Sequence, residues 1–465
     1  MLASPGGSRL SAARGLAAAA LASLVVLTGC LGGGDDDGAG AGPAPRLSAS
    51  QPCREAHGFT CSTLVVPLDH ARPGGATLRL QVGSAGDADA PVLLALAGGP
   101  GQPGVALGDR TVRRLGPAAR DYRLVMYDQR GTGDGALRCP ALQRAMGSSD
   151  LYPPPAPAVR ECARALGPAR RLFGTDDVVE DMEALRRALG VDKWTLSGVS
   201  YGTFVAARYA LAHPEHVQAL VLDSVVPHAG REDLAVAGMS ETPRVLRLAC
   251  ASRRCPGDPV ADLRAVVRRT GRGPQLLDAL TFTSIIDPTY RRIDVPSILH
   301  DARPGDTARL DRFLGTVRRF SAAGAEFLSQ GLHASSLCAD WRFPWGDSEA
   351  PLAGREDAVR AHARRLSPRQ LGPFDRATAT GNGFIRQCLY WPPTPATPAP
   401  RPGTRLPAVP TLLLSGDRDL STPLKWAREE AALAPEGRLV VIRGAGHSVE
   451  RTPAGRRAIR AFLQR

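Results

Sequence analysis

Lysine is almost absent from this sequence of 465 residues, in which Lys193 and Lys425 are the only two. The net charge of +13 therefore rests on arginine, and the arginines are spread along the chain. Nucleic-acid-binding surfaces are usually built from blocks of basic residues interleaved with aromatic ones, and no such block occurs here. We therefore expect no nucleic-acid partner.

A hydrophobic run long enough to cross a membrane is also missing. The apolar run 15–27 follows Arg9 and Arg14 and is too short to span a bilayer, but it has the layout of a secretory signal. The run ends in Leu-Thr-Gly-Cys, which resembles a bacterial lipobox and predicts lipidation at Cys30; an ordinary cleaved signal is the alternative. Residues 31–50, rich in Gly, Ala, Pro and Asp, are typical of a solvated tether. The N-terminal region thus predicts an exported lipoprotein on the outer side of the cell envelope.

The cysteines and histidines lack the spacing of metal ligands, since there is no CxxC pair and no histidine cluster. We therefore expect no metal or other cofactor. Nine cysteines less Cys30 leave eight, an even number in a compartment that permits disulfides. Eight cysteines allow 105 pairings. Proximity favours the first and third of the four bridges that we predict, which are Cys53–Cys61, Cys139–Cys162, Cys250–Cys255 and Cys338–Cys388.

What the sequence does contain is enough apolar material, 43% of all residues, for a full core with room for a large insertion. Short apolar strands end in Gly or Asp turns and alternate with helical patterns, as in 175–189. Such alternation predicts a mostly parallel sheet with helices on both faces and a site at the carboxyl ends of the strands.

One pentapeptide has the form of a nucleophile elbow: Gly198-Val199-Ser200-Tyr201-Gly202 lies between a predicted strand and a predicted helix. Its glycines give the close approach that a sharp strand-to-helix turn requires. Downstream, Asp419 and His447 each follow a predicted strand, and the chain order Ser, Asp, His is that of α/β-hydrolases. Asp417 and Asp223 compete for the role of the acid; we expect a turn role for the first and a structural one for the second.

The backbone N–H of Tyr201, which follows the nucleophile, is one predicted donor to an oxyanion. The other is the N–H of Gly99, in a glycine loop that follows the strand 92–97. Ser200, His447 and Asp419 would then act as nucleophile, general base and orienting acid.

The chain resembles a known family in four motifs: Gly-Gly-Pro-Gly at 98–101, Tyr-Asp-Gln-Arg-Gly-Thr-Gly at 127–133, the elbow, and Gly-Asp-Arg-Asp-Leu-Ser-Thr-Pro at 416–423. They are similar to those of prolyl-aminopeptidase-type α/β-hydrolases, and above all to the secreted actinobacterial tripeptidyl aminopeptidases with a TAP-like C-terminal region. The resemblance covers 51–465. It departs from prolyl aminopeptidases at Ala97, where those enzymes carry a histidine.

Between 228 and 404 the apolar β runs give way to helical patterns, at the position where α/β-hydrolases carry a cap. We therefore predict a divided hydrolase core at 51–227 and 405–465, with a mainly helical cap inserted at 228–404. The family resemblance implies a secreted serine aminopeptidase that releases short peptides, such as tripeptides, from free N-termini. A carboxylesterase or lipase on the same triad is the alternative, and a non-catalytic binding protein is disfavoured because no triad member is missing. An aminopeptidase needs a carboxylate that meets the substrate amine, and Asp340 and Glu326 in the cap are our candidates.

Overall fold

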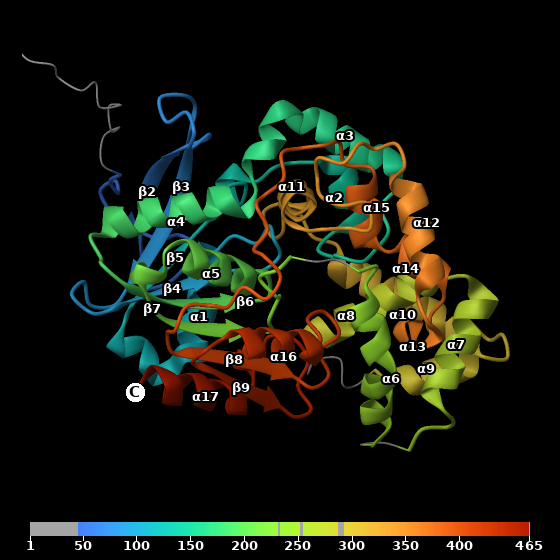
Figure 1. Cartoon of the computed structure of the whole chain (residues 1–465). Helices are drawn as coiled ribbons and strands as arrows, with labels where there is room; N and C mark the ends of the chain where they lie inside the picture. Colours follow the sequence, from blue (N-terminus) through green and yellow to red (C-terminus); the bar gives the residue numbers. More distant parts are fainter. Residues whose placement is uncertain (1–44, 231–232, 252–253, 287–292, 465) are drawn as a thin grey trace, which may run out of the picture. The chain divides into compact units, whose positions relative to one another are not determined.

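The computed structural model describes residues 45–230, 233–251, 254–286 and 293–464, and within them nine strands form one sheet (Figure 1). The order across the sheet is β1-β2-β3-β5-β4-β6-β7-β8-β9, antiparallel from β1 to β5 and parallel from β5 to β9. The strands are β1 (Gln51–Pro52), β2 (Thr60–Pro67), β3 (Thr77–Ala85), β4 (Val92–Leu96), β5 (Arg123–Tyr127), β6 (Trp194–Val199), β7 (Val217–Asp223), β8 (Thr411–Gly416) and β9 (Gly437–Ile442).

The parallel strands are apolar throughout because helices cover both faces of the sheet. In β4, every residue is buried, and neighbouring side chains such as Leu93 and Leu94 belong to two different apolar clusters. One face is covered by α4 (Thr175–Leu189), α5 (Tyr201–Ala212) and α16 (Leu424–Leu433), and the other by α1 (Gly108–Leu115) and α17 (Pro453–Leu463). The predicted α/β architecture is thereby confirmed.

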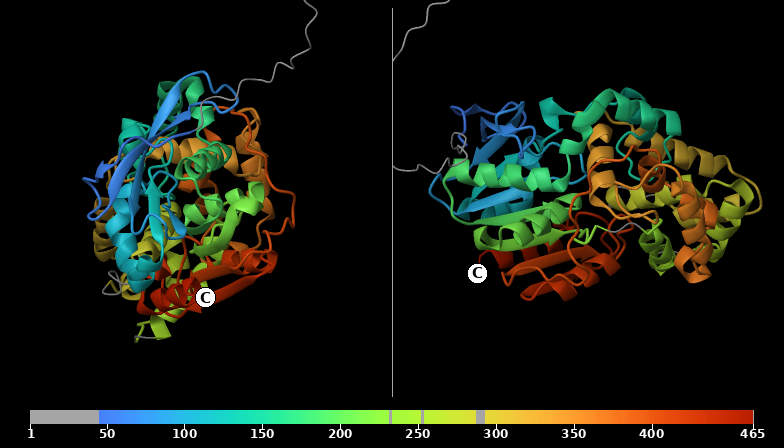
Figure 2. Two further views of the ribbon diagram at one scale, coloured as in Figure 1. Left: turned by 90° about the vertical axis from the view of Figure 1, so that its left-hand side faces the viewer. Right: turned by 45° about the horizontal axis from the view of Figure 1, so that its top comes forward.

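A helical insert separates β7 from β8, and the right-hand view of Figure 2 shows its helices as one group beside the sheet. It consists of α6 (Val236–Ala251), α7 (Pro259–Thr270), α8 (Gly273–Ile286), α9 (Val295–Ala302), α10 (Ala308–Ser321), α11 (Gln330–Asp340), α12 (Arg355–Arg365), α13 (Pro368–Leu371), α14 (Arg376–Gly381) and α15 (Gly383–Leu389).

Two helices from an earlier part of the chain join this insert. They are α2 (Pro140–Met146) and α3 (Ala156–Leu166), which pack against α11 and α15. The buried amide of Gln143 in α2 donates its Nε2 hydrogens to the carbonyls of Gly147, Ala323 and Leu328. The loop between α2 and α3 is therefore fixed to the insert.

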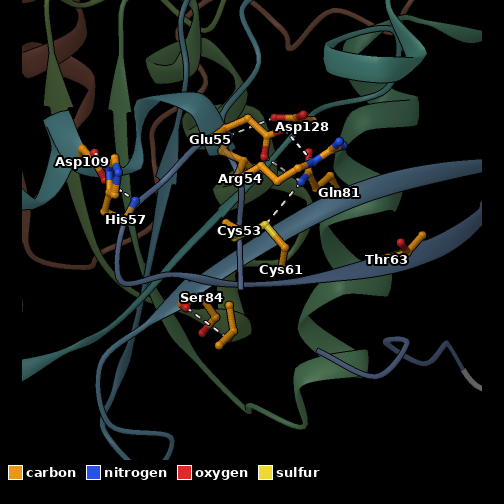
Figure 3. The surroundings of a disulfide bond; sticks show 12 residues. Cys53, Arg54, Glu55, His57, Cys61, Thr63, Gln81, Ser84, Asp109 and Asp128 are labelled. Carbon is orange, nitrogen blue, oxygen red and sulfur yellow. Dashed lines mark hydrogen bonds and ion pairs between the residues drawn. A yellow bond between two sulfur atoms is a disulfide. The ribbon is translucent and has the colours of Figure 1, made fainter. Parts of the chain in front are cut away.

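Four disulfides join the same cysteine pairs that the sequence predicts. Cys53–Cys61 ties the loop after β1 to β2, and Figure 3 shows its surroundings. Beside it, Nδ1 of His57 lies 2.7 Å from Oδ2 of Asp109, so the same loop is also held to the first turn of α1. Cys338–Cys388 joins α11 to α15 inside the insert.

The predicted signal segment, Cys30 and residues 31–44 of the predicted tether lie outside the described residues. Within the described ranges, no helix has both the length and the apolar character that a membrane crossing would need.

Candidate active site

Ser200 occupies a strained turn between β6 and α5, with φ 56° and ψ −126°. Both flanking glycines are required by the backbone around them. A Cβ on Gly198 would lie 2.3 Å from the carbonyl oxygen of Gly202, and a Cβ on Gly202 would lie 2.5 Å from the carbonyl oxygen of Leu96. The pentapeptide therefore forms the turn that a nucleophile elbow requires.

Asp419 and His447 lie beyond the ends of β8 and β9, where they form a hydrogen-bonded pair. Nδ1 of His447 is 2.9 Å from Oδ2 of Asp419, and both side chains are buried. Three further hydrogen bonds reach the Asp419 carboxylate, from the N–H of Ser421 at 2.9 Å, the N–H of Thr422 at 3.0 Å and the hydroxyl of Thr422 at 2.6 Å. These bonds fix the orientation of the carboxylate that faces the imidazole.

The pair also shifts the pKa values of both groups. Burial acts to raise the pKa of Asp419, but the charge of His447 and the hydrogen bonds from His447 and Thr422 outweigh it, so the pKa lies below its usual value. Burial acts to lower the pKa of His447, and the charge and hydrogen bond of Asp419 outweigh it, so this pKa lies above its usual value. The structure thus favours an ionised Asp419 that stabilises a protonated His447.

The two competing carboxylates serve the backbone. Oδ1 of Asp417 accepts a hydrogen bond from the N–H of Gly444 at 2.7 Å, which joins the segment after β8 to the segment after β9. The buried Asp223 accepts from the N–H groups of Val449 and Glu450, at 3.0 and 2.8 Å. Asp223 thereby holds the loop that carries His447.

Ser200 and His447 line one cleft of about 360 Å³, together with Gly98 and Gly99 of the glycine loop. The loop passes so close to the serine that a Cβ on Gly98 would lie 3.1 Å from Cβ of Ser200. Tyr201 is the first residue of α5, so its N–H lies outside the hydrogen-bonding pattern of the helix. The glycine loop and the start of α5 therefore both lie next to the serine.

The structure is at odds with the prediction that Asp340 meets a substrate amine. Asp340 is buried, and four donors saturate its carboxylate: the N–H and hydroxyl of Thr175 at 2.9 and 2.6 Å, the hydroxyl of Tyr201 at 2.7 Å, and the hydroxyl of Thr397 at 2.8 Å. Its role is to anchor the Tyr201 ring and the start of α4. The second candidate, Glu326, is exposed and lies 4.0 Å from Arg138.

Two side chains that matter to the cleft were missed by the sequence analysis. Thr422 stands beside the predicted acid in the Asp-Leu-Ser-Thr run, and a hydroxyl three residues after an aspartate is the signal that could have found it. Asp150 lines the cleft from the loop between α2 and α3, and its Gly-Ser-Ser-Asp context reads as an ordinary solvated turn. In the part of the chain that the structure describes, no three His, Cys, Asp or Glu side chains gather as metal ligands.

Comparison with known proteins agrees with this geometry. Residues 91–245 match the family described as alpha/beta hydrolase fold, and residues 374–465 match the family described as TAP-like protein. The chain therefore has the α/β-hydrolase fold with a TAP-like C-terminal region, and it is a serine hydrolase.

Two relatives have names that state an activity. The serine protease Hip1 of Mycobacterium tuberculosis is 26% identical over 458 residues, which cover 86% of this chain and 84% of the relative. A tripeptidyl aminopeptidase of Streptomyces lividans is 31% identical over 188 residues, which cover 36% of this chain and 35% of the relative. Both relatives are peptidases by name.

Proposed function

We propose that this protein is an exported serine aminopeptidase that releases short peptides, such as tripeptides, from free N-termini. The observation that carries the proposal is the joint placement of the strained Ser200, the buried Asp419–His447 pair and the glycine loop around one cleft. The TAP-like region and the relatives named as a tripeptidyl aminopeptidase and a serine protease support a peptide substrate.

In the proposed reaction, His447 takes the proton of the Ser200 hydroxyl as the oxygen attacks the scissile carbonyl, and later returns a proton to the leaving amine. Asp419 holds the imidazole so that Nε2 is free to act, and stabilises the imidazolium that forms. The N–H groups of Gly99 and Tyr201 hold the oxyanion of the tetrahedral intermediate, each contributing on the order of 10²–10³ in rate. Water then hydrolyses the acyl-enzyme by the same steps.

A carboxylesterase is the second candidate, and the apolar side of the cleft favours it. Side chains from the insert give the cleft an apolar wall, namely Phe282, Ile285, Ile286, Phe320 and Phe327. Such a wall suits an acyl chain as well as an apolar peptide side chain. The triad chemistry is the same for both bonds, so only the substrate distinguishes the two functions.

The test compares three chromogenic substrates: a tripeptide p-nitroanilide with a free amine, its N-acetylated twin and a p-nitrophenyl ester. The proposal expects the free tripeptide to be hydrolysed well and its acetylated twin poorly. Equal rates for the free and the N-acetylated tripeptide would refute the aminopeptidase function and favour the esterase function. A fluorophosphonate probe should label the wild-type protein in either case.

For the location of the protein, we propose export and lipid anchoring through Cys30. The support is the sequence of the N-terminal segment together with four disulfides, which persist in oxidising compartments. Wild-type protein should partition into detergent, and Cys30→Ala should either be released or remain unprocessed. A soluble wild-type form that begins after Cys30 would contradict the anchor.

A further inference from the structure

The two carboxylates that line the catalytic cleft differ in how they are neutralised. Glu450 is buried and forms an ion pair with Arg114, and Arg451 also lines the cleft beside it. Burial raises the pKa of Glu450 to about 7 in spite of these arginines. Glu450 is therefore already committed to Arg114 and is not available to a substrate amine. The other carboxylate is Asp150, which has no arginine or lysine partner among the described residues.

Asp150 is held in place by one of its two oxygens. Oδ1 lies 3.0 Å from Nε2 of His333, a fully buried side chain of α11. The opposite nitrogen of the ring, Nδ1, lies 2.9 Å from Oε1 of Gln387 in α15, so the imidazole cannot turn away. No hydrogen bond reaches Oδ2 of Asp150 from the described residues, and about a fifth of the side chain is exposed, 19%. The carboxylate is thus oriented, largely desolvated and open to one further donor.

Asp150 also lies where two cavities meet. It lines the catalytic cleft and an adjoining cavity of about 200 Å³, and Ser421, two residues after Asp419, lines both as well. The second cavity carries Asp233 and Glu429 on its wall, and both are paired: Asp233 with His362, and Glu429 with Lys425 at 3.8 Å. A peptide that extends from Ser200 into the second cavity therefore passes Asp150, which lines both.

We propose that Asp150 binds the protonated N-terminal amine of the substrate and thereby restricts cleavage to short N-terminal peptides. This inference rests on the aminopeptidase function proposed above. An ammonium group pairs strongly with a carboxylate that is already desolvated and oriented, because little freedom remains to be lost on binding. The exposed Glu326 lacks this advantage, since water screens its charge and Arg138 lies beside it.

The experiment measures kcat/KM of the wild type and Asp150→Asn on a free tripeptide p-nitroanilide, its N-acetylated twin and a p-nitrophenyl ester. In D150N the free tripeptide should lose about 30-fold or more, since a desolvated partner charge has been removed. The acetylated twin and the ester should change by no more than about 2-fold. Asp150→Glu keeps the charge and should recover part of the preference. Glu326→Gln removes the exposed carboxylate next to Phe327, which lines the cleft, and should keep the full preference.

The outcomes separate the two proposals. If wild type hydrolyses the twins equally, the aminopeptidase function fails and the role of Asp150 fails with it. If wild type prefers the free amine and D150N keeps that preference, the aminopeptidase function stands and Asp150 is overturned. The ester rate reports correct folding, and if D150N does not fold, Asp150→Ser takes its place in the same comparison.

Discussion

The hydroxyl of Thr422 is expected to support catalysis through Asp419. Thr422 is buried, and its Oγ1 lies 2.6 Å from Oδ2 of Asp419, the oxygen that also faces Nδ1 of His447. Oγ1 lies 3.2 Å from that nitrogen. Thr422→Val keeps the volume and the backbone hydrogen bond to Asp419 but removes the hydroxyl. The variant therefore isolates one of the four hydrogen bonds that hold the carboxylate.

The expected loss follows from the charge on the acceptor. A hydrogen bond to a charged group contributes about 1.5–3 kcal/mol. If most of this is used to orient the imidazolium, kcat falls by about 10- to 100-fold, since 1.36 kcal/mol corresponds to a factor of ten. KM should change little because Thr422 supports the triad and not the substrate. The hydrogen bond also helps to lower the pKa of Asp419, so that pKa should rise in the variant.

The assay is steady-state hydrolysis of the free tripeptide p-nitroanilide, with active sites counted by fluorophosphonate titration. Thr422→Ser keeps the hydroxyl and should retain most of kcat. An unchanged kcat in Thr422→Val would show that the remaining bonds hold Asp419 without help. An equal loss in both variants would assign the effect to packing of the Thr422 methyl group.

Three further outcomes are expected. Ser200→Ala should abolish fluorophosphonate labelling and lower turnover by about 10⁴- to 10⁶-fold, and retained labelling would assign the nucleophile elsewhere. The kcat/KM profile should rise with pH through an apparent pKa above 6.5, the ordinary value of histidine. Burial acts to lower the pKa of His447, but the effect of Asp419 raises it by more. An inflection below 6.5 would contradict this. The same shift stabilises the fold below pH 6.5, and this contribution is lost as the pH rises through the folded-state pKa. Asp340→Ala should cost about 3–5 kcal/mol of unfolding free energy in denaturant titrations, because it leaves buried donors unpaired, whereas an altered amine preference at full stability would restore the predicted substrate role.

The sequence predicted those site residues whose positions are set by their neighbours in the chain. Ser200 must sit in a turn whose glycines are two residues away on either side, and the close approaches at both glycines explain why. Asp419 and His447 each follow a strand within a few residues, so the sheet itself brings them together once its strands are parallel. Two of the disulfides could also be predicted from closeness in the chain, since Cys53–Cys61 and Cys250–Cys255 join residues that are 8 and 5 positions apart.

The roles of the carboxylates in the insert could not be predicted in this way. The hydroxyl of Thr175 that meets Asp340 is 165 residues away in the chain, and that of Tyr201 is 139 residues away. The helices α2 and α3 also pack against the insert, although the sequence pattern placed their segment in the hydrolase core. No property of the Gly-Ser-Ser-Asp run indicates that its loop faces the catalytic cleft.

A substrate-binding carboxylate is better recognised by the hydrogen bonds it still lacks than by its place in the chain. Asp340, Asp223 and Asp419 are buried, and backbone or hydroxyl donors occupy both oxygens of each. None of the three is free to bind a substrate amine, because displacing their donors would cost more than the amine returns. Asp150 has one oxygen held by His333 and the other without a donor from the described residues. That remaining capacity, at the edge of the cleft that contains Ser200, is what makes Asp150 the residue to test.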